Sequence, residues 1–228
     1  MLEVLPRKKK ESASEYVKRV LEYNIIHMKL LPGEQLQEKI LAEQLDVSRT
    51  PIREAILELK RRNIINVYPQ HGTYVSYLDI KYSDDIRYLR YVFEGALVER
   101  ACEIRDQATI NRMYENVQLQ KLYIRRDRDR FLQLDDEYHE AIYDMCNCGM
   151  VYGIVRENSL HFDRLRMISY DLDSACELID EHAAIIESIE NGEKQRARAL
   201  CERHLTRAIS DLDRIREKYP QYFRPEKE

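Results

Sequence analysis

The chain has 228 residues, of which 44% are hydrophobic and 34% are charged, a composition typical of one large or two modest globular domains rather than of a disordered or membrane-embedded chain. Charges interrupt the apolar stretches within a few residues, so we expect no membrane-spanning segment and no membrane partner. The first residues lack the basic-then-apolar order of a signal peptide, and we therefore expect a cytoplasmic protein. Its five cysteines, an odd number, are expected to pack in the core rather than to form disulfides.

Charge is distributed unevenly along the chain. Residues 1–78 contain 13 Lys and Arg and 10 Asp and Glu, whereas residues 79–228 contain 24 and 31, so the two parts carry +3 and −7 and together give the net charge of −4. A cationic surface attracts the phosphates of nucleic acids. We therefore expect a nucleic-acid-binding domain over residues 1–78 and a second domain with a different role over residues 79–228, linked near Leu78–Tyr82.

Three helices are predicted in the first 62 residues. Ser12–Glu15 has the form of a capping box and precedes apolar residues at helical spacing. This helix is expected to end at Leu31–Glu34, because Pro32 disfavours the helical conformation of the residue before it. A short second helix follows, and a third is predicted over residues 49–62, with Ser48 or Thr50 as its N-cap. Its inward face consists of Ile52, Ala55, Ile56 and Leu59.

The hydrophobic period then changes from 3.6 to 2. Apolar residues alternate on both sides of Pro69–Gly72, which predicts two short strands joined by a turn. A β-hairpin that follows a helix-turn-helix is a wing. We therefore predict a winged helix-turn-helix of three helices and a β-hairpin over residues 1–78.

From Ser83 onward no strand pattern returns, so a mostly α protein with a C-terminal all-α antiparallel helical bundle is predicted. Ser174–Glu177 has the form of a second capping box, and Asn191-Gly192 is a typical helix stop. The predicted helical blocks are residues 83–104, 109–126, 129–147, 150–171, 174–191 and 193–218.

The first turn of the third helix contains polar residues suited to DNA. Arg49 and Arg53 are four residues apart and share one face, where Arg can donate two hydrogen bonds to a guanine edge. Thr50 offers a hydroxyl to a phosphate or a base. The alternative is that these arginines are solvated charges on a surface helix.

The segments SRTPIREAI, LLPGEQL and QHGTYV resemble the winged helix-turn-helix of the GntR family over residues 12–77. The resemblance implies that DNA is contacted by the start of the third helix and by the tip of the wing, that is, by Ser48, Arg49, Thr50, Arg53, His71 and Gly72. Asn63 stands where the family usually has glycine. Asparagine tolerates left-handed backbone geometry, so the fold is expected to survive this change.

Four residues of the C-terminal part are candidate metal ligands. Asp135 and His139 are four residues apart and share a helical face, where a carboxylate and an imidazole can coordinate one ion. Such a pair alone is more often a hydrogen bond on a helix surface. His182 and His204 lie among apolar helical neighbours, where a histidine without a metal is usually hydrogen-bonded in the core.

Taken together, the Asp-x-x-aromatic-His pattern, Glu181-His182 and His204 resemble the FCD ligand-binding domain of FadR-type GntR regulators over residues 83–215. Six rather than seven helical blocks point to the VanR-like subgroup. The resemblance implies a divalent metal, zinc or alternatively nickel or another transition metal, that leaves coordination positions open for a carboxylate effector. The implied ligands are Asp135, His139, His182 and His204.

The resemblance also suggests that Arg90 faces the pocket and clamps the effector carboxylate, because a guanidinium matches a carboxylate with two hydrogen bonds. Arg87 is the rival candidate. The alternative for Arg90 is a surface ion pair with Glu94, four residues further on.

The resulting hypothesis is a ligand-responsive transcriptional regulator that binds a palindromic double-stranded DNA operator as a homodimer, most simply as a repressor that releases DNA when its effector binds. A metal-dependent hydrolase using the Asp/His site is the alternative. The sequence contains no HExxH, G-x-S-x-G or P-loop motif, so we expect that the protein is not an enzyme and has no catalytic residues.

Overall fold

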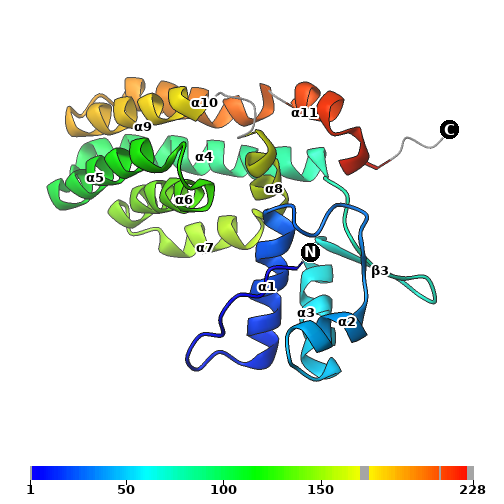
Figure 1. Cartoon of the computed structure of the whole chain (residues 1–228). Coiled ribbons are helices and arrows are strands. Elements are labelled where there is room, and N and C mark those ends of the chain that lie inside the picture. Colours follow the sequence, from blue (N-terminus) through cyan, green and yellow to red (C-terminus); the bar gives the residue numbers. More distant parts are fainter. Residues whose placement is uncertain (1, 170–174, 211, 225–228) are drawn as a thin grey trace. The chain divides into compact units, whose positions relative to one another are not determined.

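The computed structural model describes residues 2–169, 175–210 and 212–224. The described part is mostly helical with one small sheet (Figure 1), so the predicted fold class is confirmed. In chain order the elements are α1 (Ala13–Ile26), β1 (Gln35–Leu36), α2 (Glu38–Gln44), α3 (Arg49–Arg61), β2 (Ile65–Tyr68), β3 (Gly72–Val75), α4 (Ile80–Ile104), α5 (Gln107–Tyr123), α6 (Arg128–Met145), α7 (Gly149–Glu157), α8 (Leu160–Ser169), α9 (Ala175–Glu190), α10 (Lys194–Ser210), α11 (Leu212–Lys218) and the 3-10 turn η2 (Pro220–Tyr222).

Helix α1 begins as the sequence predicts. The Ser12 side chain accepts a hydrogen bond from the backbone N–H of Glu15, and the Glu15 carboxylate accepts one from the backbone N–H of Ser12, which completes the capping box. Helix α3 also forms over the predicted range, and Ser48 rather than Thr50 is its N-cap residue. The apolar faces of α1, α2 and α3 pack into one core that includes Leu21, Ile52 and Leu59.

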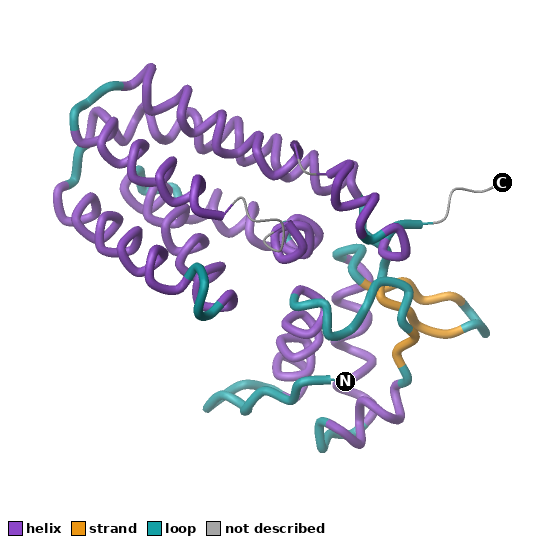
Figure 2. The backbone as a smooth tube through the Cα atoms, turned by 45° about the horizontal axis from the view of Figure 1, so that its top comes forward, coloured by secondary structure: helices purple, strands orange, loops and turns teal. Residues whose placement is uncertain are grey.

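The sheet has the strand order β1-β3-β2, with both pairs antiparallel. Its β2–β3 hairpin, shown with β1 in orange in Figure 2, is the predicted wing. Asn63, just before β2, adopts a φ of +59°, which confirms that asparagine supplies the left-handed geometry at this position. Gly72 has a φ of +118°, a backbone conformation that favours glycine at the start of β3.

The chain divides into two compact units, and the first contains a helix from far along the sequence. This unit comprises the described residues up to Ser83, Leu160–Ile168, which is α8 without its last residue, and the described residues from Asp213 on. In α8, His161 donates from Nε2 to the Asn63 carbonyl oxygen at 3.0 Å. Arg164, with 0% exposure, donates to the Ser76 carbonyl oxygen at 2.8 Å. Helix α8 therefore supports the backbone on both sides of the wing.

The second unit comprises Asp84–Ser159 and the described residues between Ser169 and Leu212. In it α5 packs against α6 and α9, and α9 against α10, around a core that includes Met113, Phe131 and Ile186. The predicted stop after α9 is confirmed, because Gly192 has a φ of +73° in the turn to α10. The second predicted capping box begins at Ser174, which lies outside the described residues.

One predicted helical block is split in the described part of the structure. Block 150–171 divides into α7 and α8 at Asn158-Ser159, where the Asn158 side chain donates to the Ile154 carbonyl oxygen and the Ser159 hydroxyl to that of Val155. Such side chains compete with the backbone of a helix and favour its end. Block 193–218 is helical on both sides of residue 211, as α10 and α11, and residue 211 lies outside the described residues. Among the described helices, none has the length and apolar character that crossing a bilayer requires.

The buried His161 should make the stability of the first unit depend on pH. Burial and the neighbouring Arg164 lower the pKa of His161 to about 4, although its hydrogen bond to Asn63 and the charge of Asp79 act in the opposite direction. Between that value and the ordinary pKa of about 6.5, the unfolded state binds more protons than the folded state. The stabilisation is therefore complete above the higher value and declines as the pH falls through this window, by up to about 3 kcal/mol.

We expect His161→Gln to flatten the dependence of the free energy of unfolding on pH between about 4 and 6.5, as measured by urea denaturation at a series of pH values. Gln70→Asn, at an exposed residue of the same unit that carries no titratable group, is the control and should retain the wild-type slope. An unchanged slope in His161→Gln would contradict this assignment.

Candidate metal centre and DNA-binding surface

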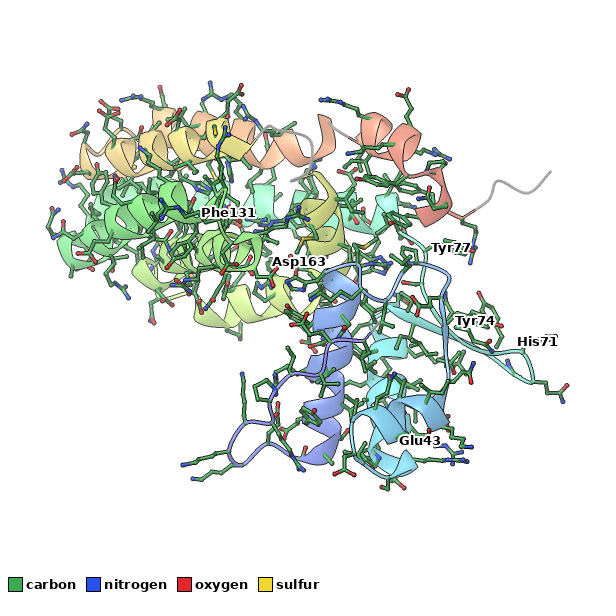
Figure 3. The ribbon with its side chains drawn as sticks, viewed as in Figure 1. Glu43, His71, Tyr74, Tyr77, Phe131 and Asp163 are labelled. Atoms are coloured by element: carbon green, nitrogen blue, oxygen red, sulfur yellow. The ribbon has the colours of Figure 1, made fainter. Side chains whose placement is uncertain are left out.

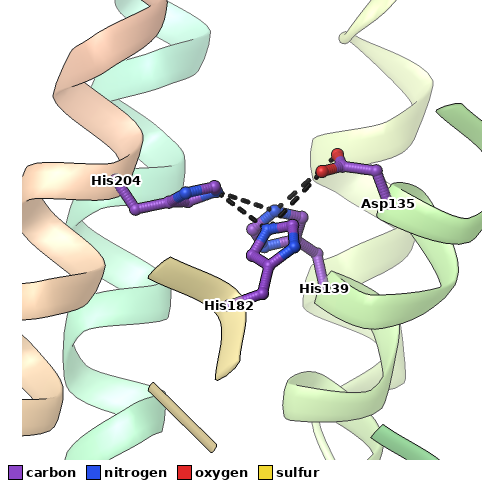
Figure 4. Close-up of side chains that lie close together, drawn as sticks. All are labelled: Asp135, His139, His182 and His204. Atoms are coloured by element: carbon purple, nitrogen blue, oxygen red, sulfur yellow. Dashed lines mark hydrogen bonds and ion pairs between the residues drawn. The ribbon is translucent and has the colours of Figure 1, made fainter. Parts of the chain in front are cut away.

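The four predicted metal ligands meet inside the second unit. Asp135 and His139 come from α6, His182 from α9 and His204 from α10, and all four are buried (Figure 4). One ligand atom from each lies within 4.8 Å of the others. The His204 Nε2 lies 3.2 Å from that of His182 and 3.3 Å from that of His139. Asp135 completes the group, with Oδ1 3.5 Å from His182 Nε2 and Oδ2 3.8 Å from His139 Nε2.

Each histidine is oriented by an oxygen acceptor on the other side of its ring. Since Nδ1 must donate to these oxygens, the lone pair of each neutral ring is on Nε2 and points to the centre of the group. The three Nδ1 contacts are His139 to the Glu94 carboxylate at 2.7 Å, His182 to the Gln120 side-chain oxygen at 2.8 Å, and His204 to the Glu181 carboxylate at 3.2 Å.

Burial favours the neutral form of two of the three rings, those of His139 and His182. Burial lowers the pKa of His139, and it lowers that of His182 to well below its ordinary value. Burial alone would raise the pKa of Glu94, but the charges of Arg90 and His139 hold it at about 2. For Glu181 as well, the hydrogen bond from His204 and the charge of Arg207 outweigh burial and lower the pKa. Ionised acceptors and neutral rings are the protonation states that metal binding requires.

The donor set fits a transition-metal ion. The Nε2 lone pair of His204 repels those of His182 and His139 at these distances unless a cation lies between them. Two nitrogen ligands bound tetrahedrally to zinc lie about 3.3 Å apart, and the distances from the His204 Nε2 to the other two Nε2 atoms are 3.2 and 3.3 Å. Three imidazoles and one carboxylate suit zinc, nickel or a similar ion.

Arg90 is linked to His139 of this centre through Glu94. Its Nε donates to Glu94 Oε1 at 2.9 Å, and Glu94 binds His139 through its other oxygen. The predicted alternative was a surface ion pair with Glu94, but both partners of the pair are buried. Arg87 instead contacts Asp84, whose side chain is half exposed.

The DNA-binding candidates of the first unit lie on its surface. Ser48, Arg49, Thr50 and Arg53, at the start of α3, all have exposed side chains. The Arg53 Nε donates to Glu38 of α2 at 2.8 Å, an exposed ion pair that contributes little to stability and leaves Arg53 able to exchange partners.

At the wing, His71 lies at the far end of the hairpin and is exposed, as Figure 3 shows. The Tyr74 hydroxyl donates to the His71 carbonyl oxygen at 2.9 Å. This hydrogen bond and the positive φ of Gly72 define the backbone conformation at the tip of the wing. The structure thus brings the start of α3 and the wing into one unit, with their candidate DNA-contacting side chains exposed.

The oxygen acceptors behind the histidines are not apparent from the sequence. Glu181 belongs to the motif that contains His182, but the motif gives it no role, and Glu94 is predicted only as a partner of Arg90. The four-residue spacing of Arg90 and Glu94 is the one local signal for that buried pair. No local pattern marks Gln120, because its contact with His182 joins residues far apart in the sequence.

Comparisons with known proteins agree with this architecture. Residues 13–75 match the model of bacterial regulatory proteins of the gntR family, and residues 85–207 match that of the FCD domain. A transcriptional regulator encoded in an unstable DNA locus of Streptomyces ambofaciens is 30% identical over 203 residues, which are 87% of this chain and 84% of the relative. The chain belongs to the GntR family and carries an FCD domain.

Other relatives of the regulator are also transcription factors. The HTH-type transcriptional repressor RspR of Escherichia coli K12 is 25% identical over 218 residues, which cover 95% of this chain and 96% of RspR. Among solved structures, that of E. coli McbR/YncC is similar with a TM-score of 0.74 at 22% identity, over 91% of this chain and 99% of the other. The latter likeness shows the fold.

These findings identify the protein as a transcriptional regulator. Its GntR domain implies DNA binding and its FCD domain implies an effector. FCD domains often bind a metal, and the Asp/His group of this regulator is able to hold one. The relatives named above are regulators, and none supports the alternative of a hydrolase.

We expect zinc to raise the melting temperature of EDTA-treated regulator, because an ion that binds only the folded state stabilises it, by about 4 kcal/mol at 1,000 times the dissociation constant. Asp135→Asn and His182→Ala should abolish most of the rise. Asp144→Asn, at an exposed position of the same helix as Asp135, is the matched control. Equal shifts in all these proteins would place the zinc elsewhere.

Proposed function

We propose that the regulator binds a palindromic operator as a homodimer and represses transcription until a small carboxylate effector binds at a divalent metal in its FCD domain. The observation that carries this proposal is the convergence of three oriented histidines and Asp135 on one point. A regulator that needed only a packed core would gain nothing from three lone pairs directed at one another. The metal, most simply zinc, supplies the positive charge that attracts an anionic effector.

Recognition of DNA is assigned to α3 and the wing. The start of a helix favours phosphates, and exposed arginines on its first turns reach base edges in the major groove. Arg49, Thr50 and Arg53 have this placement. Ser48 is the N-cap residue, with its side chain exposed, and His71 and Gly72 lie at the end of the wing that would contact the groove or backbone alongside. A palindrome would be read by two copies of this unit related by twofold symmetry.

The proposed role as a repressor is supported by the names of two relatives and by the coupling expected between effector binding and operator affinity. RspR is named a repressor, as is the gluconate operon regulator of Bacillus subtilis, which is 25% identical over 210 residues. An effector that binds one arrangement of the dimer better than another changes operator affinity by the ratio of its two affinities. Loss of operator affinity on effector binding is therefore the expected response.

We expect Arg49→Ala and Arg53→Ala to weaken binding to duplexes that the wild-type protein enriches from a random-sequence pool, by about 10- to 100-fold each, because each removes a base or phosphate contact. Fluorescence anisotropy at fixed salt measures the affinity. Arg61→Ala, at an exposed arginine in the last turn of the same helix, should bind as the wild type does. If all three variants bind equally, α3 is not the recognition helix.

The effector is assigned to the carboxylate class, with Arg90 as its clamp. We expect one member of a panel of sugar acids, hydroxy acids and dicarboxylates to raise the melting temperature further, and only when metal is bound. Arg90→Gln should abolish this second rise, whereas Arg87→Gln should retain it because Arg87 contacts Asp84 instead. Elemental analysis of each variant separates loss of effector from loss of metal. If Arg87→Gln abolishes the second rise and Arg90→Gln retains it, Arg87 is the clamp. If no acid changes the melting temperature of the metal-bound protein, the carboxylate assignment is wrong.

A further inference from the structure

The first unit has a strongly cationic segment that the recognition helix and the wing do not account for. Arg7, Lys8, Lys9 and Lys10 are four consecutive basic residues, and all four are exposed. They form the tip of a loop that precedes α1. A run of charges is often only a solvated surface. A binding role for this segment therefore requires that the chain hold it in a fixed position and that this position be close to a ligand.

The segment before the loop is anchored on α1. The backbone N–H of Glu3 donates to Asn24 Oδ1 at 2.7 Å, and Asn24 Nδ2 donates to the Glu3 carbonyl oxygen at 2.9 Å. Asn24 has 0% exposure, and Lys29 forms an ion pair with the Glu3 carboxylate. Leu2 and Leu5 pack against the core of the unit. The chain therefore runs back along α1 as a fixed arm.

The base of the loop is closed by Glu11. Its carboxylate accepts two hydrogen bonds from Arg19, at 2.6 and 2.8 Å, and Arg19 also donates to the Pro6 carbonyl oxygen at 3.0 Å. Arg7 donates twice to the Glu11 carbonyl oxygen. The one carboxylate of the loop is thus committed to Arg19 at its base, while the ammonium groups of Lys8, Lys9 and Lys10 remain exposed at the tip.

Ion pairs between α1 and α3 show where this tip lies. Lys18 pairs with Glu58, and Glu22 pairs with Arg62, so the two helices run parallel and residue n of α1 is level with about residue n + 40 of α3. Ser12, the N-cap of α1, is therefore level with the first turn of α3. The loop projects beyond that end of α1, as Figure 1 shows in dark blue, and so lies at the same end of the unit as Arg49.

We propose that Lys8, Lys9 and Lys10 form a second phosphate-binding surface, which contacts the backbone of double-stranded DNA beside the groove that α3 enters. This inference rests on the proposed function of α3. Lysine ammonium groups act as point charges toward phosphates and carry no base preference. The surface therefore adds affinity for any duplex sequence, whereas the first turn of α3 supplies the selection.

Release of counterions gives this surface a measurable signature. The logarithm of the binding constant falls with the logarithm of salt concentration, with a slope of about −0.9 for each phosphate neutralised. Loss of three phosphate contacts would thus make the slope shallower by up to about 2.7. The effect should be the same on an enriched duplex and on a duplex of mixed sequence.

The test compares full-length wild type with a Lys8→Gln, Lys9→Gln, Lys10→Gln triple variant. The probe is a fluorescein-labelled duplex of mixed sequence, about 30 base pairs or three helical turns long, and anisotropy gives affinity across a salt series. The matched control removes three exposed charges from the second unit, as Lys121→Gln, Arg125→Gln and Arg126→Gln. We expect a shallower slope in the loop variant alone. Equal slopes in wild type, loop variant and control would overturn the proposal.

A charge-preserving variant, with Lys8, Lys9 and Lys10 all changed to Arg, should keep the wild-type slope, which separates charge from a local change of shape. Arg49→Ala separates the inference from the function on which it rests. If Arg49→Ala weakens binding to an enriched duplex and the loop variant binds normally, only the second surface is wrong. If wild-type protein binds neither duplex at any salt concentration, both proposals fail.

Discussion

The regulator's second unit depends on one arrangement: each of three histidines donates its Nδ1 proton outward to an oxygen and turns its Nε2 inward. The outward acceptors come from α4, α5 and α9, and the histidines come from α6, α9 and α10. The same hydrogen bonds therefore set the ring orientations and join five helices around a polar centre within an apolar core. Tyr138 adds to this by stacking on the His182 ring and donating to its backbone oxygen at 3.1 Å.

Arg90 influences this centre through the charge of Glu94. A buried ion pair is costly to form, but removing one partner leaves an uncompensated charge, at a cost of about 3–5 kcal/mol. Glu94 stays ionised because of Arg90, and it is this ionised carboxylate that orients His139. An arginine with such a neighbour has a fixed position, and a fixed hydrogen-bond donor loses less entropy on binding a ligand than a mobile one.

Local signals in the sequence predicted local structure well. The capping box at Ser12, the left-handed turn at Asn63 and the stop at Gly192 each depend on neighbours within a few residues, and the structure has all three. The four candidate metal ligands were predicted only as a set, through resemblance. The contact of Gln120 with His182 and that of Arg164 with Ser76 could not be predicted, because each joins surfaces brought together by tertiary packing rather than by periodicity.

The position of α8 within the first unit limits where the DNA-binding part of this regulator can be separated from the rest of the chain. The segment that matches the gntR model ends at residue 75, yet the physical unit to which it belongs includes a helix more than 80 residues later. A fragment cut at the end of the matched segment would lack Ser76 and α8, leave the Asn63 carbonyl oxygen without its imidazole donor and expose core that Leu160 covers. Grafting this DNA-binding module onto another sensor therefore requires α8 to be transplanted with it, or its contacts to be rebuilt in the host.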